Sequence, residues 1–139
     1  MSDKVSKEIR SKNMAAIHNK GTKLEEMVSK KLWTLGFRFR KNVSGLLGKP
    51  DIVIKKYKIV IFIDSCFWHG CTIHAKIPTT NESFWRDKIN KNRMRDMEVT
   101  DYYQRNGWNI LRVWEHEIYK DFDITMEKIK TFIWHAKRL

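Results

Sequence analysis

The amino-acid sequence predicts an α/β fold, and two observations carry this prediction. Apolar residues recur at helical spacing near residue 30 and again near residue 130, whereas short apolar runs between charged or glycine-containing turns are typical of strands. The chain has 139 residues, and its six glycines and two prolines are spread too thinly to form a linker. We therefore expect one domain over residues 1–139.

The first predicted helix begins at Lys23 and ends before Gly36, which is its expected stop. Its apolar stripe follows the spacing of a helix and consists of Leu24, Met27, Val28, Leu32 and Leu35. The dozen residues at the start of the chain are polar and charged, and we expect them to become ordered only against a partner.

Three strands are predicted next. Phe37 and Phe39 alternate with basic neighbours, which is the period of a short strand. Residues 44–49 form a glycine-punctuated turn. The apolar runs 51–55 and 59–63, separated by a short polar turn, then predict a hairpin.

The second half of the chain predicts a loop, a long helix, a strand and a closing helix. Residues 66–80 lack periodicity and contain Cys, His, Gly and Pro. Asn81 or Ser83 is the expected cap of a helix that runs to about Arg105, with Gly107 just past its end. Residues 108–114 are predicted to form a strand. The stripe of the closing helix consists of Met126, Ile129, Phe132, Ile133 and Ala136.

Composition narrows the class of protein. The chain carries 28 Lys and Arg against 16 Asp and Glu, a formal charge of +12, which indicates a polyanionic partner. An apolar content of 42% excludes a disordered chain, and no apolar run is long enough to span a membrane. Two cysteines are too few for a disulfide scaffold, and the N-terminus lacks an apolar signal core. We expect a cytoplasmic protein.

Carboxylates at neighbouring strand ends predict a magnesium site. Asp51 opens one strand of the predicted hairpin and Asp64 follows the other, and Mg²⁺ binds through one or two carboxylates while keeping its waters. A common Pro-Asp turn is the alternative. Glu25 fits a capping box with Thr22, which does not exclude contact with a metal-bound water. His69 is either a general base or a solvated loop residue.

A second metal is predicted in the loop. Two thiols and an imidazole occur within nine residues, and a second imidazole follows the last strand, where the chain can return to the loop. The predicted ligands are Cys66, Cys71, His74 and His116. Two Cys and two His suit a closed, structural Zn²⁺ site, although the spacing is not that of a zinc finger. Unrelated thiols and surface histidines are the alternative.

The long helix and the loop before it carry features of a nucleic-acid interface. The helix begins with a run of basic residues, namely Arg86, Lys88, Lys91, Arg93 and Arg95. Such a run is either a solvated face or, in a strongly basic domain, a row of phosphate contacts. Phe67 and Trp68 either pack around the zinc or stack against bases.

Taken together, these segments resemble the very-short-patch repair (Vsr) endonucleases, bacterial enzymes that nick DNA at T:G mismatches. The similarity extends from about residue 10 to residue 120, with the motifs in order. The matching segments are RSKNMAAI at 10–17, Thr22 and Glu25, GKPD at 48–51, VIFIDSCFWH at 60–69, FWRDKINKN at 84–92, GW at 107–108 and RVWE at 112–115.

The resemblance implies a restriction-endonuclease-like fold of the PD-(D/E)xK type, with a central mixed sheet flanked by helices and a structural zinc loop. It implies that Asp51 and the backbone carbonyl of Ile63 bind two Mg²⁺ ions. Asp64 and Glu25 orient metal-bound waters, and His69 is the catalytic acid/base. Asp64 departs from the family, since the best-known members have histidine there, and the zinc ligands also exchange types between positions.

The resemblance also implies DNA-contacting residues and partners. Residues 1–20 form a DNA-contacting segment that includes Met14 and Ile17 at the minor groove. The wedge beside the mismatch consists of Phe67, Trp68 and Trp85, and Lys88 and Asn92 lie near the mismatched pair. The implied partners are double-stranded DNA with a T:G mismatch, a cytosine-5 DNA methyltransferase and mismatch-repair proteins, and we expect a nucleoid-associated monomer.

The sequence therefore predicts a Mg²⁺-dependent DNA endonuclease that nicks one strand 5′ of the T in a T:G pair. One alternative is a restriction-type nuclease of the same fold without mismatch preference. The other is a zinc-stabilised DNA-binding protein whose nuclease centre is inactive, against which Asp51 and His69 argue.

Overall fold

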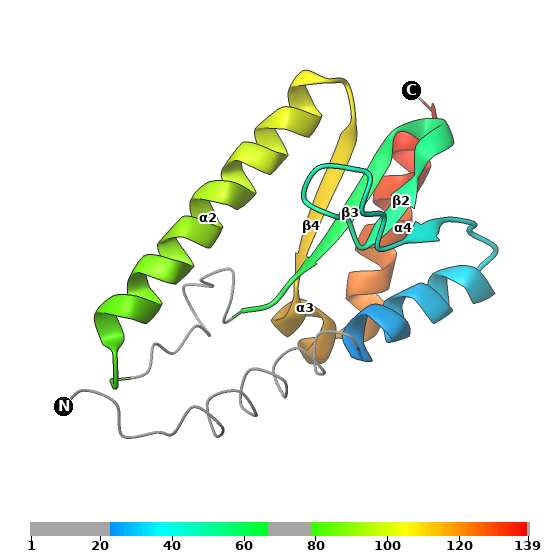
Figure 1. The fold of residues 1–139 in the computed structure, drawn as a ribbon. Helices are drawn as coiled ribbons and strands as arrows, with labels where there is room; N and C mark the ends of the chain where they lie inside the picture. The colour runs from blue at the N-terminus through cyan, green and yellow to red at the C-terminus, as the bar shows by residue number, and fades with distance from the viewer. Residues whose placement is uncertain (1–22, 67–78, 139) are drawn as a thin grey trace.

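A four-stranded mixed sheet organises the part of the chain that the computed structural model describes, residues 23–66 and 79–138 (Figure 1). The strand order is β1-β2-β3-β4. The strands are β1 (Arg40–Lys41), β2 (Ile52–Ile54), β3 (Ile59–Asp64) and β4 (Asn109–Trp114). β1, β2 and β3 pair antiparallel, whereas β3 and β4 are parallel. The parallel pair needs a long crossover, and the 24-residue helix α2 (Glu82–Arg105) provides it.

The β2–β3 hairpin turns through a short 3₁₀ helix, η1 (Lys55–Tyr57). Lys58 follows in the left-handed conformation, with φ of 52°, and its N–H donates to the carbonyl of Lys55. Because Ile52 pairs with Ile61 and Ile54 with Ile59, the beginning of β2 lies beside the end of β3. This register brings Asp51 next to the last residues of β3.

Helices cover both faces of the sheet (Figure 1). Residues 23–34 are helical and pack, together with α3 (Glu115–Lys120) and α4 (Phe122–Arg138), against one face. The buried core there includes Leu24, Val28, Leu32, Ile61 and Ile129. α2 covers the other face through a smaller core, which consists of Val53, Val60, Phe62, Val99 and Tyr103. The end of the hairpin therefore lies between two helical layers.

The structure confirms the α/β prediction, the hairpin and the order of the predicted elements. The predicted apolar stripe of the first helix was wrong at two positions, because the side chains of Met27 and Leu35 are 45% and 40% exposed. The strand expected at Phe37 and Phe39 begins only at Arg40. α3 was not predicted.

The predicted cap of α2 is also corrected. Asn81 does precede the helix, but its backbone is left-handed, with φ of 58°, and its side chain forms no capping hydrogen bond. Ser83 lies inside the helix. Thr22 of the predicted capping box and residues 67–78 of the predicted zinc loop fall outside the described residues.

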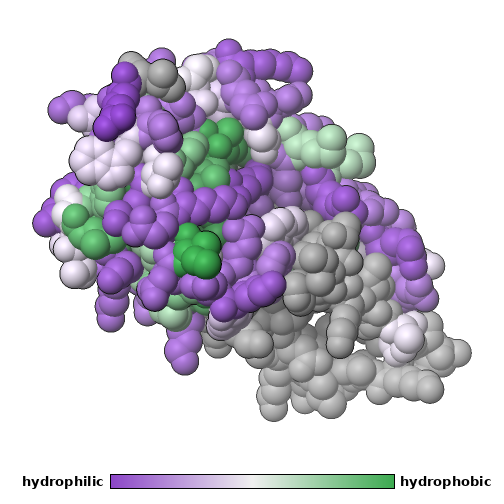
Figure 2. Space-filling view, turned by 180° about the vertical axis from the view of Figure 1, so that it is seen from behind, coloured by the Kyte–Doolittle hydropathy of each residue, from purple (hydrophilic) through white to green (hydrophobic). Residues whose placement is uncertain are grey.

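Among the described residues, no helix is long and apolar enough to cross a membrane. Figure 2 views the molecule from behind Figure 1, and hydrophilic residues cover most of the coloured surface, with small apolar areas between them. This surface agrees with the composition, in which 32% of the residues are charged.

Candidate active site

Three carboxylates lie close together where the hairpin ends. Asp51 directly precedes β2, and Asp64 is the last residue of β3. The backbone N–H of Ile63 donates to Oδ2 of Asp51 at 2.7 Å. Glu25, on the 23–34 helix, is hydrogen-bonded to the Asp51 side chain. The hairpin register and one helix therefore bring together residues that are distant in sequence.

Crowding of these carboxylates changes the acidity of Asp51. Burial, the hydrogen bond with Glu25 and the negative charges of Glu25 and Asp64 raise the pKa of Asp51 to about 8. The N–H of Ile63 opposes this shift because it stabilises the ionised form. A cation at this point would relieve the repulsion, which is the electrostatic condition that favours a metal ion.

The turn before Asp51 is held by α2. Gly48 has φ of 74°, and a Cβ atom there would lie 2.9 Å from Cγ1 of Val99, so both the backbone and the close approach require glycine. Tyr103 donates its hydroxyl hydrogen to the carbonyl of Leu47. The carbonyl of Asp51 accepts from the N–H of Asn42 at 3.1 Å. These contacts fix the backbone that carries the Asp51 carboxylate.

Asp64 has a partner that the sequence analysis missed. Nη1 of Arg112, on β4, donates to Oδ1 and Oδ2 of Asp64 at 3.0 and 3.2 Å. Arg112 is the only charged residue in the strand sequence NILRVW. A lone cation in an otherwise uncharged strand was the signal available in the sequence.

Two predicted zinc ligands meet beside this site. Sγ of Cys66 lies 3.2 Å from Nδ1 of His116, although fifty residues separate them. The N–H of Cys66 donates to Oε1 of Glu115 at 2.9 Å, which fixes the start of the loop. Across residues 23–66 and 79–138, no group of three or more His, Cys, Asp or Glu side chains converges as the ligands of one metal ion would, and this includes Asp51, Glu25 and Asp64, which affect one another's charge without converging in this way.

The other predicted zinc ligands and several predicted DNA contacts fall in the ranges 1–22 and 67–78, outside the described residues. They are Met14, Ile17, Phe67, Trp68, Cys71 and His74, and the predicted catalytic residue His69 also lies in the range 67–78.

α2 carries the remaining predicted DNA contacts. Lys88 and Asn92 are four residues apart and half-buried, so they lie on one side of the helix. Trp85 is only 8% exposed, whereas its neighbour Phe84 is 52% exposed and packs edge-on against it. A stacking role of Trp85 would require its ring to leave this buried position.

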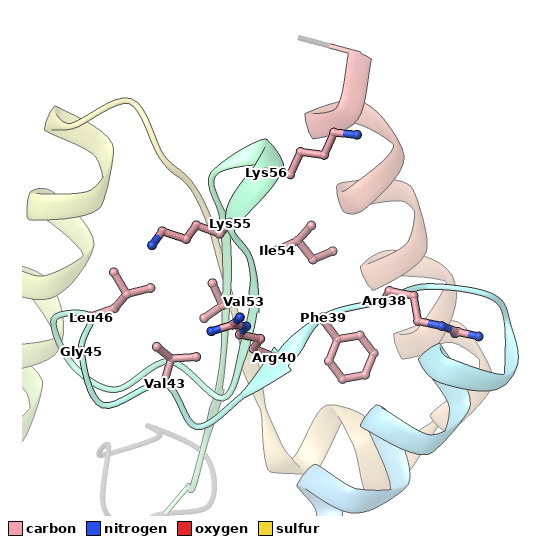
Figure 3. A pocket seen from close by; sticks show the side chains of 10 residues that line it. All are labelled: Arg38, Phe39, Arg40, Val43, Gly45, Leu46, Val53, Ile54, Lys55 and Lys56. Atoms are coloured by element: carbon pink, nitrogen blue, oxygen red, sulfur yellow. The ribbon is translucent and has the colours of Figure 1, made fainter.

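A basic pocket of about 400 Å³ lies along the edge strand β1 (Figure 3). Its floor is apolar, with Phe39, Val43, Leu46, Val53 and Ile54 among the lining residues. Its charged lining consists of Arg38, Arg40, Lys55 and Lys56, without an acidic residue. In Figure 3, Arg40 lies next to Val53 at the centre of the pocket.

Comparisons with known proteins show the family of the chain. The family model described as DNA mismatch endonuclease Vsr matches residues 2–75. Type II nicking enzyme V.HpaIIP of Haemophilus parainfluenzae is 44% identical over 132 residues, covering 91% of this chain and 94% of that protein. Type II nicking enzyme V.NmeDIP of Neisseria meningitidis serogroup C is 40% identical over 130 residues, covering 92% and 88%. DNA mismatch endonuclease Vsr of Escherichia coli (strain K12) is 41% identical over 116 residues, covering 83% and 74%.

A mixed α/β sheet with clustered carboxylates at the end of a hairpin, together with these relatives, defines a DNA endonuclease, a hydrolase of phosphodiester bonds. The chain belongs to the Vsr family, and its sheet and flanking helices are compatible with the fold of that nuclease family.

Proposed function

We propose that this endonuclease nicks one DNA strand 5′ of the T in a T:G mismatch and depends on Mg²⁺. The observation that carries the proposal is the Asp51 carboxylate, which is held by the N–H of Ile63 and crowded by Glu25 and Asp64. The family match to a mismatch endonuclease supports the substrate.

The residues at the hairpin end fit a hard divalent cation. In a strand, the N–H and C=O of one residue face the same neighbour, so the carbonyl of Ile63 faces the side on which its N–H meets Asp51. Asp51 and this carbonyl are the proposed ligands of two Mg²⁺ ions. Bound there, the metal would activate a water and stabilise the leaving 3′-oxygen.

Other groups of the chain assist the hydrolysis. Glu25 and Asp64 orient water at the site, and their proximity to Asp51 supports this role. His69 transfers the proton, as its motif in the family implies. One structural Zn²⁺ is held by Cys66, Cys71, His74 and His116 and orders the loop that carries His69. The 3.2 Å approach of Cys66 to His116 supports that ligand set.

Mismatch preference is assigned to aromatic side chains next to the basic helix. Phe67, Trp68 and Trp85 would wedge beside the mismatched pair, while Lys88 and Asn92 contact its displaced edges. Residues 1–20, through Met14 and Ile17, approach from the minor groove. The cationic start of α2 and the basic pocket at β1 supply positive charge for the phosphates.

The cellular setting follows from the substrate. T:G pairs arise when 5-methylcytosine deaminates, so a cytosine-5 methyltransferase acts in the same cell, and mismatch-repair proteins act on the nicked product. We propose that the chain is a monomeric single domain that works in the cytoplasm, at the nucleoid.

A second candidate function is nicking without mismatch preference. Several relatives carry the name type II nicking enzyme, and Asp64 replaces the histidine of the best-known family members. The two candidates share the active site and differ only in the duplex that they cut.

One assay separates the candidates. Purified protein is incubated with matched T:A and mismatched T:G duplexes of one sequence, with Mg²⁺ or with EDTA, and the nicked strand is mapped. Nicking of T:G alone, in Mg²⁺ alone, supports the proposal. Equal nicking of both duplexes supports the second candidate, and activity that persists in EDTA contradicts the metal assignment.

A further inference from the structure

Arg112 connects three elements around the carboxylate site. It lies on β4 opposite Phe62 of β3, so its side chain and that of Asp64, two residues further along β3, share the face covered by α2. Nη1 contacts both oxygens of Asp64, and Nε donates to Oγ1 of Thr100 at 2.9 Å. Nη2 donates to the carbonyl of Asp96 at 3.2 Å.

The guanidinium has little freedom to move. The Cζ atom of Arg112 lies 4.4 Å from the centre of the Phe62 ring. The planar guanidinium therefore packs on this ring while its nitrogen atoms form the hydrogen bonds. The side chain of Arg112 is 21% exposed and that of Asp64 is 6% exposed. Lysine lacks the planar fork and could not make these bonds at once.

The α2 residues that hold Arg112 continue a row of i, i+4 neighbours that begins with the proposed DNA contacts. Lys88, Asn92, Asp96 and Thr100 follow one another at intervals of four, and all four are half-buried. This row, the α2 stripe, runs from the basic start of the helix to the guanidinium. Arg112 therefore lies between the α2 stripe and the carboxylates.

We propose that Arg112 is a positioning residue of the endonuclease. It holds the Asp64 carboxylate beside Asp51 and couples it to the α2 stripe, so that DNA bound along α2 orders the site of hydrolysis. This inference rests on the proposed function, because it assigns Asp64 a role in that reaction and Lys88 and Asn92 a role in DNA contact.

A purely structural ion pair would behave differently. Replacement of a buried ion pair by apolar groups is often neutral, whereas removal of one partner is costly because it leaves a buried charge. Stability alone cannot distinguish the two roles, so the test compares rates and coupling at temperatures well below the melting transition of each variant.

The first measurement is the single-turnover nicking rate of Arg112→Met, Arg112→Lys, Asp64→Asn and the double variant Asp64→Asn/Arg112→Met. We expect Arg112→Met to lower the rate about 10- to 100-fold, as loss of supporting residues around a metal site does. Arg112→Lys should fall between Arg112→Met and wild type. In the Asp64→Asn background the second substitution should add little, because Arg112 acts through Asp64.

Arg105→Met is the matched control. It removes one cation and an exposed ion pair, with Asp101 at 3.2 Å, from α2, the helix whose Thr100 and Asp96 hold Arg112. We expect it to leave the nicking rate unchanged. A rate for Arg112→Met within about threefold of this control, or losses that simply add in the double variant, would overturn the proposal. If Arg112→Met does not fold, Arg112→Lys and the double variant, which removes both charges of the Arg112–Asp64 pair, carry the comparison.

The second measurement needs no cleavage and uses amide hydrogen exchange with a T:G duplex without added Mg²⁺, so that the proposed Zn²⁺ stays bound. In wild type and Arg105→Met, DNA should slow exchange both in α2 and at residues 62–65. In Arg112→Met, protection should remain in α2 and be lost at residues 62–65. Equal protection there in all three proteins would overturn the coupling. A wild type that binds but nicks no duplex would refute the proposed function, while the exchange result would still decide the role of Arg112.

Discussion

The backbone N–H of Ile63 donates to the Asp51 carboxylate at 2.7 Å, in the place where a continued β2 strand would supply a backbone acceptor. β2 begins only at Ile52, two residues after Pro50, which the register would pair with Ile63, and the side chain of Asp51 supplies the acceptor instead. The same carboxylate is hydrogen-bonded to Glu25 on the 23–34 helix. Asp51 is thus both the structural end of the hairpin and the centre of the acidic cluster.

Asp51→Asn should abolish nicking in Mg²⁺ while duplex binding persists. The amide keeps the shape of the side chain and can still accept from Ile63, but it lacks the charge that a divalent cation requires. Cleavage and electrophoretic binding assays measure the two properties separately. Asp101→Asn, at an exposed position on α2, is the control and should cut normally. Normal cleavage by Asp51→Asn would refute the metal assignment.

The stability of the metal-free protein should fall as pH rises from about 4 to about 8. Asp51 has a pKa raised from its ordinary value of 3.8 to about 8, so in this window the folded protein keeps a proton that the unfolded chain has lost. One such group contributes a slope of at most about 1.4 kcal/mol per pH unit. Above pH 8 both states are ionised and this contribution becomes constant.

Asp51→Asn is the variant that checks this slope. Urea unfolding in EDTA at several pH values should give a shallower decline for the variant, which should exceed wild type in stability at the alkaline end. If the free energy of unfolding changes with pH equally in the two proteins, a group other than Asp51 causes the decline.

Much of this arrangement was predictable from the sequence, because hairpins have local signals. The runs 51–55 and 59–63 with a short turn fix antiparallel pairing, and that pairing alone places Asp51 near the end of β3. The buried positions of the closing helix likewise follow its periodicity, since Met126, Ile129, Ile133 and Ala136 are all buried.

Other features depend on tertiary register. Arg112 and Asp64 are 48 residues apart, and only the parallel alignment of β4 with β3 brings them together. α3 is six residues long, too short for periodicity to reveal it. Met27 lies at the margin of the apolar stripe, and Leu35 follows the last helical residue, so both side chains are exposed.

Zinc content should be one equivalent and should depend on His116. His116→Gln removes an imidazole ligand 3.2 Å from the Cys66 thiol, and the binding energy of a structural metal, on the order of several kcal/mol at least, is folding energy. We expect loss of zinc and a lower melting temperature, measured by elemental analysis and thermal unfolding. His135→Gln, exposed on α4, should retain both. A wild-type protein purified without zinc would refute the site.

DNA affinity should decrease steeply with salt. Arg86, Lys91, Arg93 and Arg95 are exposed on α2, and each can neutralise a phosphate. With roughly six phosphates contacted, affinity should fall on the order of 10³-fold between about 50 and 200 mM salt. Arg93→Ala should reduce the slope of log affinity against log salt by about 0.9, whereas Lys128→Ala on α4 should leave it unchanged. A flat salt response would mean that these basic residues of α2 are only solvated surface.

Trp68→Ala should lower the preference for T:G over T:A by more than it lowers general duplex affinity. Insertion of an apolar ring beside a base step costs a few kcal/mol of unstacking, and this cost is smallest where the pair is already mismatched. The wedge should therefore favour cleavage of the T:G duplex over the T:A duplex. Trp134→Ala is the matched control, because that ring is exposed on α4, over the sheet face opposite α2. Nicking rates on both duplexes, with the melting temperature of each variant, decide the role. If Trp68 only packs in its loop, the melting temperature falls and the preference ratio stays at the wild-type value, which would remove the wedge from the mechanism.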